Sequence, residues 1–392
     1  MKTLIQTSLC VILTVLIGSC ASRQKPPEDV EVITTNEELI STDGLELEKV
    51  QMPAGFKIEV FARVQNARSM SMSPNGTLFV GNRKKDKVYA VRDTNGDWKA
   101  DEIHVIAEGL RMPNGVAFKD GSLYIAEVSR LLRFDDIEKQ LANPPKPVTI
   151  YDDYPSDAHH GWKYIAFGPD GKLYVPVGAP CNICESKNEL YASITRMDPD
   201  GSNREVYAHG VRNTVGFTWH PNTNEMWFTD NGRDWLGNDE PPCELNRVTT
   251  TGEHFGYPYC HGGYLKDPEF GDKYPCKDFR KPVQNLGPHV APLGLKFNTG
   301  GMFPSSFNDK IFIAEHGSWN RDQEVGHTGY KITTVTHRNG EGIAYEDFAV
   351  GFLNQESNKG WARPVDILFM EDGSMLVSDD LGGTIFRISY AG

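Results

Sequence analysis

SPNGTLFVGN, residues 73–82, reads as a tight turn followed by a strand, and the same pattern recurs five more times along the chain. The other copies are KDGSLYIAEV (119–128), GPDGKLYVPV (168–177), HPNTNEMWFTDN (220–231), FNDKIFIAEH (307–316) and MEDGSMLVSDD (370–380). Asn-Gly and Asp-Gly accept the positive φ angles of hairpin turns, and the aromatic and β-branched residues that follow suit a pleated, half-buried strand. The six copies therefore predict six equivalent strand units.

The spacing of these copies indicates which repeat architecture they form. Successive copies lie roughly 45 to 85 residues apart, which is wider than a helical repeat and close to one four-stranded propeller blade with its loops. Helical periodicity is nearly absent outside residues 137–141. We therefore predict an all-β fold, a six-bladed β-propeller. The widest gap contains a Gly-, Pro- and Cys-rich segment, residues 234–292, which we expect to form long loops on one face.

The composition agrees with one folded domain that does not bind nucleic acid. Of the 392 residues, 39% are hydrophobic and 24% are charged, which is enough apolar surface for a packed core. Propellers exceed the usual domain size because repetition, rather than a single central core, sets their limit. The formal net charge of −13, without basic runs, disfavours nucleic acid as a partner. We expect one catalytic propeller over residues 51–392.

The first twenty residues, MKTLIQTSLCVILTVLIGSC, are typical of an export signal. One positive charge at Lys2 precedes an apolar run over residues 9–17, which is too short to span a bilayer. The run ends in Ile-Gly-Ser-Cys20, which is similar to a bacterial lipoprotein cleavage box, in which the cysteine becomes the acylated N-terminus. A cleaved signal with an incidental cysteine is the alternative.

A lipoprotein signal over residues 1–20 has consequences for the segment behind it and for location. Residues 21–50 are polar, acidic and poor in aromatic residues, as expected for a flexible tether. Cys20 would then carry the lipid. We expect an exported protein attached to the membrane by its lipid alone, in the outer membrane and facing the periplasm or the cell surface.

Five cysteines follow the signal, and in an oxidising compartment most of them should pair. The Cys181-Asn-Ile-Cys184 motif lacks the surrounding βαβ pattern of a thioredoxin-like redox site, so we expect a disulfide that closes a small loop. Cys260 with Cys276 is our preferred second pair. Cys243 also lies near Cys260 in the sequence, and one of the three thiols must stay unpaired.

Polar residues recur at one position relative to the repeats. In a propeller the first strand of each blade lines the axis, so side chains just before that strand converge at one mouth of the channel. The residues at this position are Arg68, Asn114, His160, Arg212, Asn213, His289 and Arg363. Taken one at a time, each residue has an ordinary explanation, as a surface arginine or a structural histidine. Together they predict a cationic well for an anionic planar ligand, because guanidinium groups pair with carboxylates and stack on π systems.

The motifs around these residues resemble the glucose/sorbosone dehydrogenase family of enzymes that depend on pyrroloquinoline quinone (PQQ). The resemblance covers roughly residues 50–390 and is closest to the sorbosone dehydrogenase branch. The motifs that carry it are HHGWKYIAFGPDG (159–171), VGAPC (177–181), GVRN (210–213), DNGRDW (230–235), GPHVAP (287–292), AEHGSWNR (314–321) and ARPVD (362–366).

The resemblance implies a function and roles for individual residues. The activity would be oxidation of a sugar or a sugar-derived aldehyde with PQQ and Ca2+ as cofactors, and hydride would pass to PQQ. His160 matches the general base and Arg212 the residue that stabilises charge on the quinone oxygen. The cofactor contacts would be Arg68, Asn114, Asn213, His289, His316, Arg321 and Arg363. The backbone carbonyls of Gly232 and Arg233 match the position that holds Ca2+.

Departures from soluble glucose dehydrogenase put glucose itself in doubt as the substrate. His159 replaces the aspartate that precedes the catalytic histidine, the substrate-contacting glutamine is replaced near Pro113, and the cofactor lysine is lost around His316. We expect His316 or Arg321 to take over a polar role at the ligand. No haem-attachment motif is present, so electrons would leave to an external quinone or cytochrome.

A second, structural Ca2+ is a further hypothesis. Oxygen-bearing side chains alternate at Asp93, Asn95, Asp97 and Asp101, as in Ca2+ loops of the EF-hand type. The segment lacks the full twelve-residue pattern, and an ordinary acidic hairpin would look similar. Two other functions also stay open for the chain: a Ca2+-dependent sugar lactonase, and a non-catalytic propeller that binds carbohydrate or protein.

Overall fold

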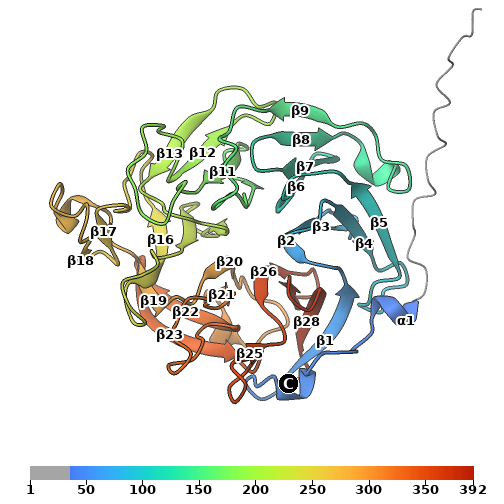
Figure 1. Ribbon diagram of the computed structural model, residues 1–392. Helices are drawn as coiled ribbons and strands as arrows, with labels where there is room; N and C mark the ends of the chain where they lie inside the picture. The colour runs from blue at the N-terminus through green and yellow to red at the C-terminus, as the bar shows by residue number, and fades with distance from the viewer. Residues whose placement is uncertain (1–35) are drawn as a thin grey trace, which may run out of the picture. The chain divides into compact units, whose positions relative to one another are not determined.

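The computed structural model describes residues 36–392 (Figure 1). These residues form six four-stranded antiparallel sheets and two small hairpins. The six sheets surround a common axis like the blades of a propeller (Figure 1). The predicted all-β, six-bladed propeller is confirmed.

In the first five blades the strands follow the chain from the innermost to the outermost position. Blade 1 consists of β2 (Ala67–Met72), β3 (Leu78–Asn82), β4 (Val88–Arg92) and β5 (Glu102–Ala107), and blade 2 of β6 (Gly115–Lys119), β7 (Ser122–Ala126), β8 (Leu131–Phe134) and β9 (Val148–Tyr151). Blade 3 consists of β10 (Ala166–Phe167), β11 (Leu173–Val177), β12 (Ser193–Met197) and β13 (Glu205–His209). Blade 4 consists of β14 (Phe217–Trp219), β15 (Met226–Asp230), β16 (Pro242–Val248) and β19 (Gln284–Pro288), and blade 5 of β20 (Pro292–Phe297), β21 (Ile311–Glu315), β22 (Lys331–Arg338) and β23 (Glu341–Ala349).

Blade 6 joins the two ends of the propeller chain. Its inner three strands are β26 (Pro364–Phe369), β27 (Met375–Asp379) and β28 (Thr384–Tyr390), and its outermost strand is β1 (Phe56–Arg63). β1 pairs with β28 in an antiparallel register that runs from Phe56 opposite Tyr390 to Arg63 opposite Thr384. This pairing closes the ring and leaves β28 without a free edge.

The six repeated segments form the second strand of every blade, namely β3, β7, β11, β15, β21 and β27. Every residue of β3, β11, β15, β21 and β27 is buried, because these strands lie between neighbouring blades. The turn glycines Gly76 and Gly121 have φ of 81° and 82°, the left-handed region that glycine occupies without strain. The repeat therefore encodes both the turn and the buried strand.

The gap in blade 4 contains a disulfide-linked excursion. It includes the hairpin of β17 (Cys260–His261) and β18 (Leu265–Lys266) and the short 3-10 helix η3 (Cys276–Asp278). The Cys260–Cys276 bond ties the two parts together, and Cys181 is bonded to Cys184. Cys243 is free and buried. Both predicted disulfides are confirmed. The second hairpin, β24 (Leu353–Asn354) with β25 (Lys359–Gly360), lies between blades 5 and 6.

The packed chain begins earlier than the boundary that we predicted at residue 51. The helix α1 (Asn36–Leu39) and the 3-10 helix η1 (Leu47–Lys49) precede β1. Leu39 is 1% exposed and belongs to the same apolar cluster as Phe61, so burial of apolar side chains holds this segment on the propeller. The signal, Cys20 and the tether up to residue 35 lie outside the described residues. Within residues 36–392 no helix is long and apolar enough to cross a membrane.

Candidate functional site

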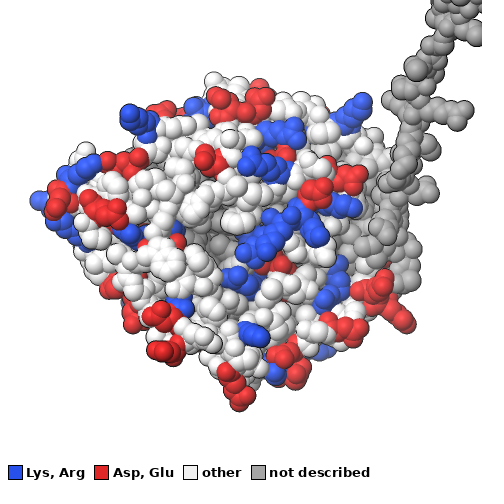
Figure 2. All heavy atoms as spheres, in the orientation of Figure 1, with Lys and Arg blue, Asp and Glu red and all other residues white. Residues whose placement is uncertain are grey.

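The predicted cofactor-binding residues next to the inner strands lie at one end of the propeller axis. Asn114 and Arg363 directly precede β6 and β26, Arg212 and Asn213 precede β14, and His289 precedes β20, whereas Arg68 is the second residue of β2. The second strand of each blade runs back to the same end, so the residues that follow it also belong there. His316 follows β21 and Asp380 follows β27. Figure 2 shows Lys and Arg side chains gathered near the centre of the face in view.

Arg68 is the centre of a buried polar cluster. Its Nε donates to Asn114 Oδ1 at 2.7 Å, and its NH1 group pairs with Asp380 Oδ2 at 2.9 Å. Asp380 also accepts a hydrogen bond from His316 Nε2 at 2.9 Å and pairs with Arg83 at 3.4 Å. Asp380 thus joins two predicted cofactor residues, Arg68 and His316, and Asn114 is linked to them through Arg68.

Asp380 was not predicted as a site residue, although it ends the sixth repeat. It is 3% exposed. Burial alone would raise its pKa, but His316, Arg68 and Arg83 outweigh burial and lower it. Burial lowers the pKa of His316 to about 3, so His316 is neutral at pH 7 and donates its Nε2 proton to an ionised Asp380. The position after a second strand could have revealed Asp380, because that position reaches the same mouth.

Arg363 is a half-buried cation that faces carbonyl groups. Its Nε donates to His316 O at 2.8 Å and its NH2 group to Gly317 O, while the guanidinium lies 5.0 Å from the centre of the Tyr330 ring. Within residues 36–392 no carboxylate forms an ion pair with Arg363, and burial lowers its pKa. A half-buried charge of this kind is stabilised by an anionic partner.

Trp162 and Lys163 connect this cluster to the third blade. The guanidinium groups of Arg68 and Arg83 lie 5.6 and 5.9 Å from the Trp162 ring centre. Asn114 Nδ2 donates to the Lys163 carbonyl at 2.8 Å. Lys163 is 2% exposed, and burial lowers its pKa to about 7. The Lys163 Nζ lies 5.4 Å from the centre of the Tyr154 ring, so Lys163 meets the cluster through its carbonyl and not through its charge.

His160 has one ring nitrogen engaged and one available. Its Nδ1 lies 2.9 Å from the carbonyl of Ala179, so Nδ1 carries the proton and Nε2 keeps its lone pair. Burial, then Arg212 and His159, lower its pKa well below the ordinary value of 6.5. His160 also has a φ of +52°, and a Cβ on Gly178 would lie 2.5 Å from the His160 Cβ. A neutral imidazole is therefore held in a strained, closely packed position, as is common at functional sites.

Arg212 and Asn213 lie beside His160. The Arg212 side chain is 5% exposed and pairs with Asp234 at 3.1 Å. The main-chain N–H groups of Arg212 and Asn213 donate to the two carboxylate oxygens of Asp230 at 2.8 and 2.7 Å. In the described chain the Asn213 side-chain amide has no hydrogen-bond partner, so it is available to a ligand.

Gly232 and Arg233 offer two free carbonyl oxygens. Neither oxygen accepts a hydrogen bond from any described residue. A Cβ on Gly232 would lie 2.8 Å from the carbonyl of Pro242, so glycine is needed for this close approach. A void of about 10 Å³ adjoins Gly232, and Asp230 and Glu244 also line it. Free carbonyl oxygens of this kind suit a hard cation such as Ca2+.

The side chains of three other predicted residues make contacts away from the Asp380 cluster. The Arg233 side chain turns away into an ion pair with Asp267 at 2.6 Å, which leaves only its carbonyl for a metal. His289 Nε2 donates to Gly237 O at 2.8 Å and so braces the loop after β15. Arg321 pairs with the exposed Asp239 at 3.4 Å, and among the described residues no hydrogen bond joins it to the Asp380 cluster.

The alternating segment from Asp93 to Asp101 is a self-bonded loop. Asp93 accepts hydrogen bonds from the main-chain N–H groups of Asn95, Gly96 and Trp98, and Asp101 accepts from Thr94 and Asn95. Asn95 and Asp97 accept from the N–H groups two residues further on. These bonds explain the acidic pattern as turn chemistry, and the second Ca2+ stays a prediction.

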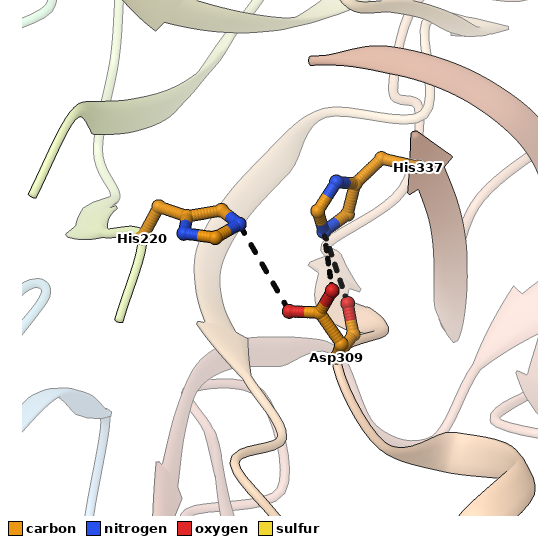
Figure 3. A group of neighbouring side chains, drawn as sticks. All are labelled: His220, Asp309 and His337. Atoms are coloured by element: carbon orange, nitrogen blue, oxygen red, sulfur yellow. Dashed lines mark hydrogen bonds and ion pairs between the residues drawn. The ribbon is translucent and has the colours of Figure 1, made fainter. Parts of the chain in front are cut away.

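Three side chains at the opposite end of blades 4 and 5 form a group that sequence analysis missed (Figure 3). His220 Nε2 lies 3.9 Å and His337 Nε2 3.7 Å from the Asp309 carboxylate, and His337 Nε2 lies 3.0 Å from the Asp309 carbonyl. His220 Nδ1 accepts main-chain N–H bonds from Asn222 and Thr223. The His220 proton is therefore on Nε2, which then lacks the lone pair that a metal ligand needs.

Two exposed tryptophans lie on the loops that adjoin Arg212. Trp235 and Trp319 are 66% and 65% exposed, and their rings make an edge-to-face contact at 5.8 Å. Asn320 Nδ2 donates to Asp234 Oδ1 at 2.6 Å, which holds the two loops together. Two neighbouring exposed indole rings form an apolar patch of the kind that marks a binding surface.

The architecture and this polar end define an all-β six-bladed β-propeller like the soluble PQQ glucose dehydrogenases. The chain belongs to the TrAA12-like family, which matches residues 50–391. The predicted resemblance is thereby confirmed at the level of this propeller family. Assignment to the sorbosone dehydrogenase branch stays a prediction.

Individual relatives agree with this membership. An uncharacterized protein of Borreliella burgdorferi is 34% identical over 380 residues, which span 90% of this chain and 95% of that protein. A PQQ-dependent pyranose dehydrogenase of Coprinopsis cinerea is 34% identical over 129 residues, 28% of this chain and 16% of that protein. A solved holo form of the Coprinopsis pyranose dehydrogenase PQQ domain has a TM-score of 0.73 at 20% identity and covers 87% of this chain and 97% of its own. A calcium structure of the Trichoderma reesei family AA12 enzyme has a TM-score of 0.74 at 19% identity, with the same coverage.

Proposed function

We propose that the protein is an oxidoreductase that uses PQQ and Ca2+ to oxidise a sugar or a sugar-derived aldehyde. The observation that carries this proposal is Arg363, a half-buried cation without an ion-pair partner in the described chain, close to Arg68 and Arg83 at one mouth of the propeller. PQQ is a tricarboxylated ortho-quinone, so its charge matches this excess of cations. Relatives described as PQQ-dependent dehydrogenases support the same choice.

The donor set fits both cofactors. Arg363 and the Asn213 amide would hold the anionic ring system, and the remaining N–H of Arg212 would be free to stabilise charge that develops during the reaction. The carbonyl oxygens of Gly232 and Arg233 would hold Ca2+. When bound, PQQ would supply the two-electron acceptor and Ca2+ would polarise its reactive carbonyl.

His160 would act as the general base. Its Nε2 lone pair can take the proton of a substrate hydroxyl because Nδ1 already donates to Ala179 O. Its lowered pKa keeps the ring neutral, and so able to accept a proton, at neutral pH. His160 would thus hold the substrate proton while Arg212, with its guanidinium fixed nearby, would stabilise negative charge that develops during the reaction.

The substrate would be a sugar of the aldose or sorbosone type. Sugars combine many hydroxyl groups with apolar C–H faces that stack on indole rings. Trp235 and Trp319, exposed on the loops beside Arg212, offer such faces. A separate quinone or cytochrome would collect the electrons, and the lipid anchor at Cys20 would place the enzyme in the outer membrane.

Reconstitution tests this function. The purified protein would be loaded with PQQ and Ca2+, and dye reduction would be followed with aldoses, sorbosone and lactones. The proposal predicts dye reduction with at least one sugar or sugar aldehyde, only in the presence of PQQ. Lactone hydrolysis without PQQ would instead support a lactonase, and binding of sugar without turnover would support a non-catalytic propeller.

A further inference from the structure

Asn182 joins the Cys181–Cys184 loop to the arginine of the site. Its carbonyl oxygen accepts a hydrogen bond from Arg212 Nε at 2.9 Å, and its Oδ1 accepts one from the Arg212 NH2 group at 2.8 Å. Oδ1 also accepts the main-chain N–H of Asp234 at 2.8 Å, and Nδ2 donates to the Asp234 carbonyl at 3.0 Å. One asparagine therefore holds both Arg212 and the loop that carries its ion-pair partner.

These contacts fix the direction of the Arg212 guanidinium. Of its five N–H donors, two go to Asn182, one to Asp234 and one to the carbonyl of Asn231 at 3.2 Å. One N–H is left for a ligand. Because a guanidinium is planar and its donors have fixed directions, the four occupied donors determine where the fifth points. The Asn182 contacts thus control the one Arg212 donor that a bound anion can use.

The disulfide holds Asn182 in place. The chain between β11 and β12, residues 178–192, contains no helix or strand, so few main-chain hydrogen bonds fix its shape. The Cys181–Cys184 bond closes a loop around Asn182, and the hydroxyl of Tyr257 accepts the Cys184 N–H at 3.0 Å. Opening the bond would return conformational freedom to this segment.

We propose that the Cys181–Cys184 disulfide and Asn182 form a redox-sensitive positioning device for Arg212. In the oxidised protein, Asn182 aims the guanidinium toward the ligand beside His160. A dithiol reductant gives two electrons and two protons to the disulfide, which becomes two thiols while the reductant becomes a disulfide. Asn182 is then released, and turnover falls without loss of the cofactor. The catalytic part of this inference rests on the proposed function.

The first test compares variants in the loaded protein. Asn182→Ala and the double variant C181S/C184S should each lower kcat at least roughly tenfold, and by no more than the ~10²–10³-fold cost of removing one charge-stabilising donor, with PQQ affinity within about twofold of wild type. A dithiol should lower kcat in wild type and in the control C260S/C276S, which lacks the other disulfide, but not in C181S/C184S. An unchanged kcat in both N182A and C181S/C184S overturns the proposal.

The second test needs neither cofactor nor turnover. In cofactor-free protein, NMR titration of the His160 ring reports the nearby Arg212 charge, which lowers the His160 pKa. Loosening Arg212 by N182A, or by reduction of the disulfide, should raise the His160 pKa toward 6.5, whereas C260S/C276S should leave it unchanged. An unaltered His160 pKa in a folded N182A variant contradicts the positioning role. If the loaded wild type oxidises no sugar, the proposed function fails, and this titration still decides whether Asn182 positions Arg212.

Discussion

Arg68 and Asp380 form a buried ion pair at 2.9 Å, although 312 residues separate them in the chain. Arg68 belongs to the first blade and Asp380 to the sixth, which the strand pairing of β1 with β28 closes. Closure of the ring therefore completes the polar cluster. Asp380 also accepts a hydrogen bond from His316 and so orients its ring. Folding of the propeller and assembly of the site are therefore linked.

Replacing Asp380 should destabilise the fold. Asp380→Asn leaves Arg68 and Arg83 without their carboxylate, and an uncompensated buried charge costs about 3–5 kcal/mol. Urea unfolding measures this loss. The control is Asp347→Asn, since the exposed Asp347 pairs with Lys331 at the surface and should contribute less than about 1 kcal/mol. Equal effects of the two substitutions would refute a special role for Asp380.

Replacing His160 should abolish turnover but spare the cofactor. His160→Ala removes the Nε2 base, and loss of a general base lowers rates by about 10²–10⁴-fold. PQQ affinity should stay within about twofold of wild type, as measured by absorbance titration. His104→Ala, in the outermost strand of blade 1, is the matched control and should keep its activity. Loss of PQQ binding in His160→Ala would show that His160 binds the cofactor and would contradict its role as the general base.

Glu244 makes stability depend on pH. Burial raises its pKa to about 8, so the folded protein keeps a proton that the unfolded chain releases above its ordinary pKa of about 4.3. The stability from this proton is complete at low pH and is lost as pH rises toward 8. Glu244→Gln stays neutral in both states.

The free energy of unfolding of Glu244→Gln, relative to wild type, should therefore rise between pH 5 and 8, by up to about 1.4 kcal/mol per pH unit. Urea titrations at four pH values test this. Glu346→Gln, at an exposed position paired with Lys310, is the control. A difference between Glu244→Gln and wild type that does not change with pH would disprove the buried proton.

Trp319 should affect binding of the sugar substrate and not binding of PQQ. Trp319→Ala removes an exposed stacking surface, and one aromatic contact is worth about 0.5–1.5 kcal/mol, so KM for a pyranose should rise roughly two- to tenfold. kcat and PQQ affinity should change little. Trp98→Ala, another exposed tryptophan, lies at a distant loop and serves as the control. An unchanged KM in Trp319→Ala would remove the indole pair from the substrate site.

The sequence was sufficient to predict the fold, because each blade repeats one turn and one buried strand. The Asn-Gly and Asp-Gly turns at Gly76, Gly121, Gly171 and Gly373 all have positive φ, so the local chemistry and the global repeat agree. The Cys260–Cys276 pair was the preferred choice, but spacing left Cys243 open as a partner until the structure showed it free and buried. The start of the packed chain was not, because Leu39 is one apolar residue in an acidic segment and only its burial against Phe61 shows that it belongs to the core.

The site was predictable only in part. A common position before the inner strands pointed to Arg68, Arg212 and Arg363, since that rule needs no knowledge of side-chain direction. The rule did not reveal Asp380 or Asn182, because their roles depend on contacts across blades and across a loop. It also could not show that the Arg233 side chain turns away toward Asp267.

The central claim is that the ring of cations binds an anionic redox quinone, and equilibrium titration with PQQ tests it most directly. Cofactor-free protein would be titrated with PQQ, with and without Ca2+, in wild type, Arg363→Ala and the exposed control Arg338→Ala. We predict saturable 1:1 binding that requires Ca2+, with Kd raised at least about tenfold in Arg363→Ala and unchanged in Arg338→Ala. No saturable binding to wild type, or equal binding by Arg363→Ala, would contradict the account.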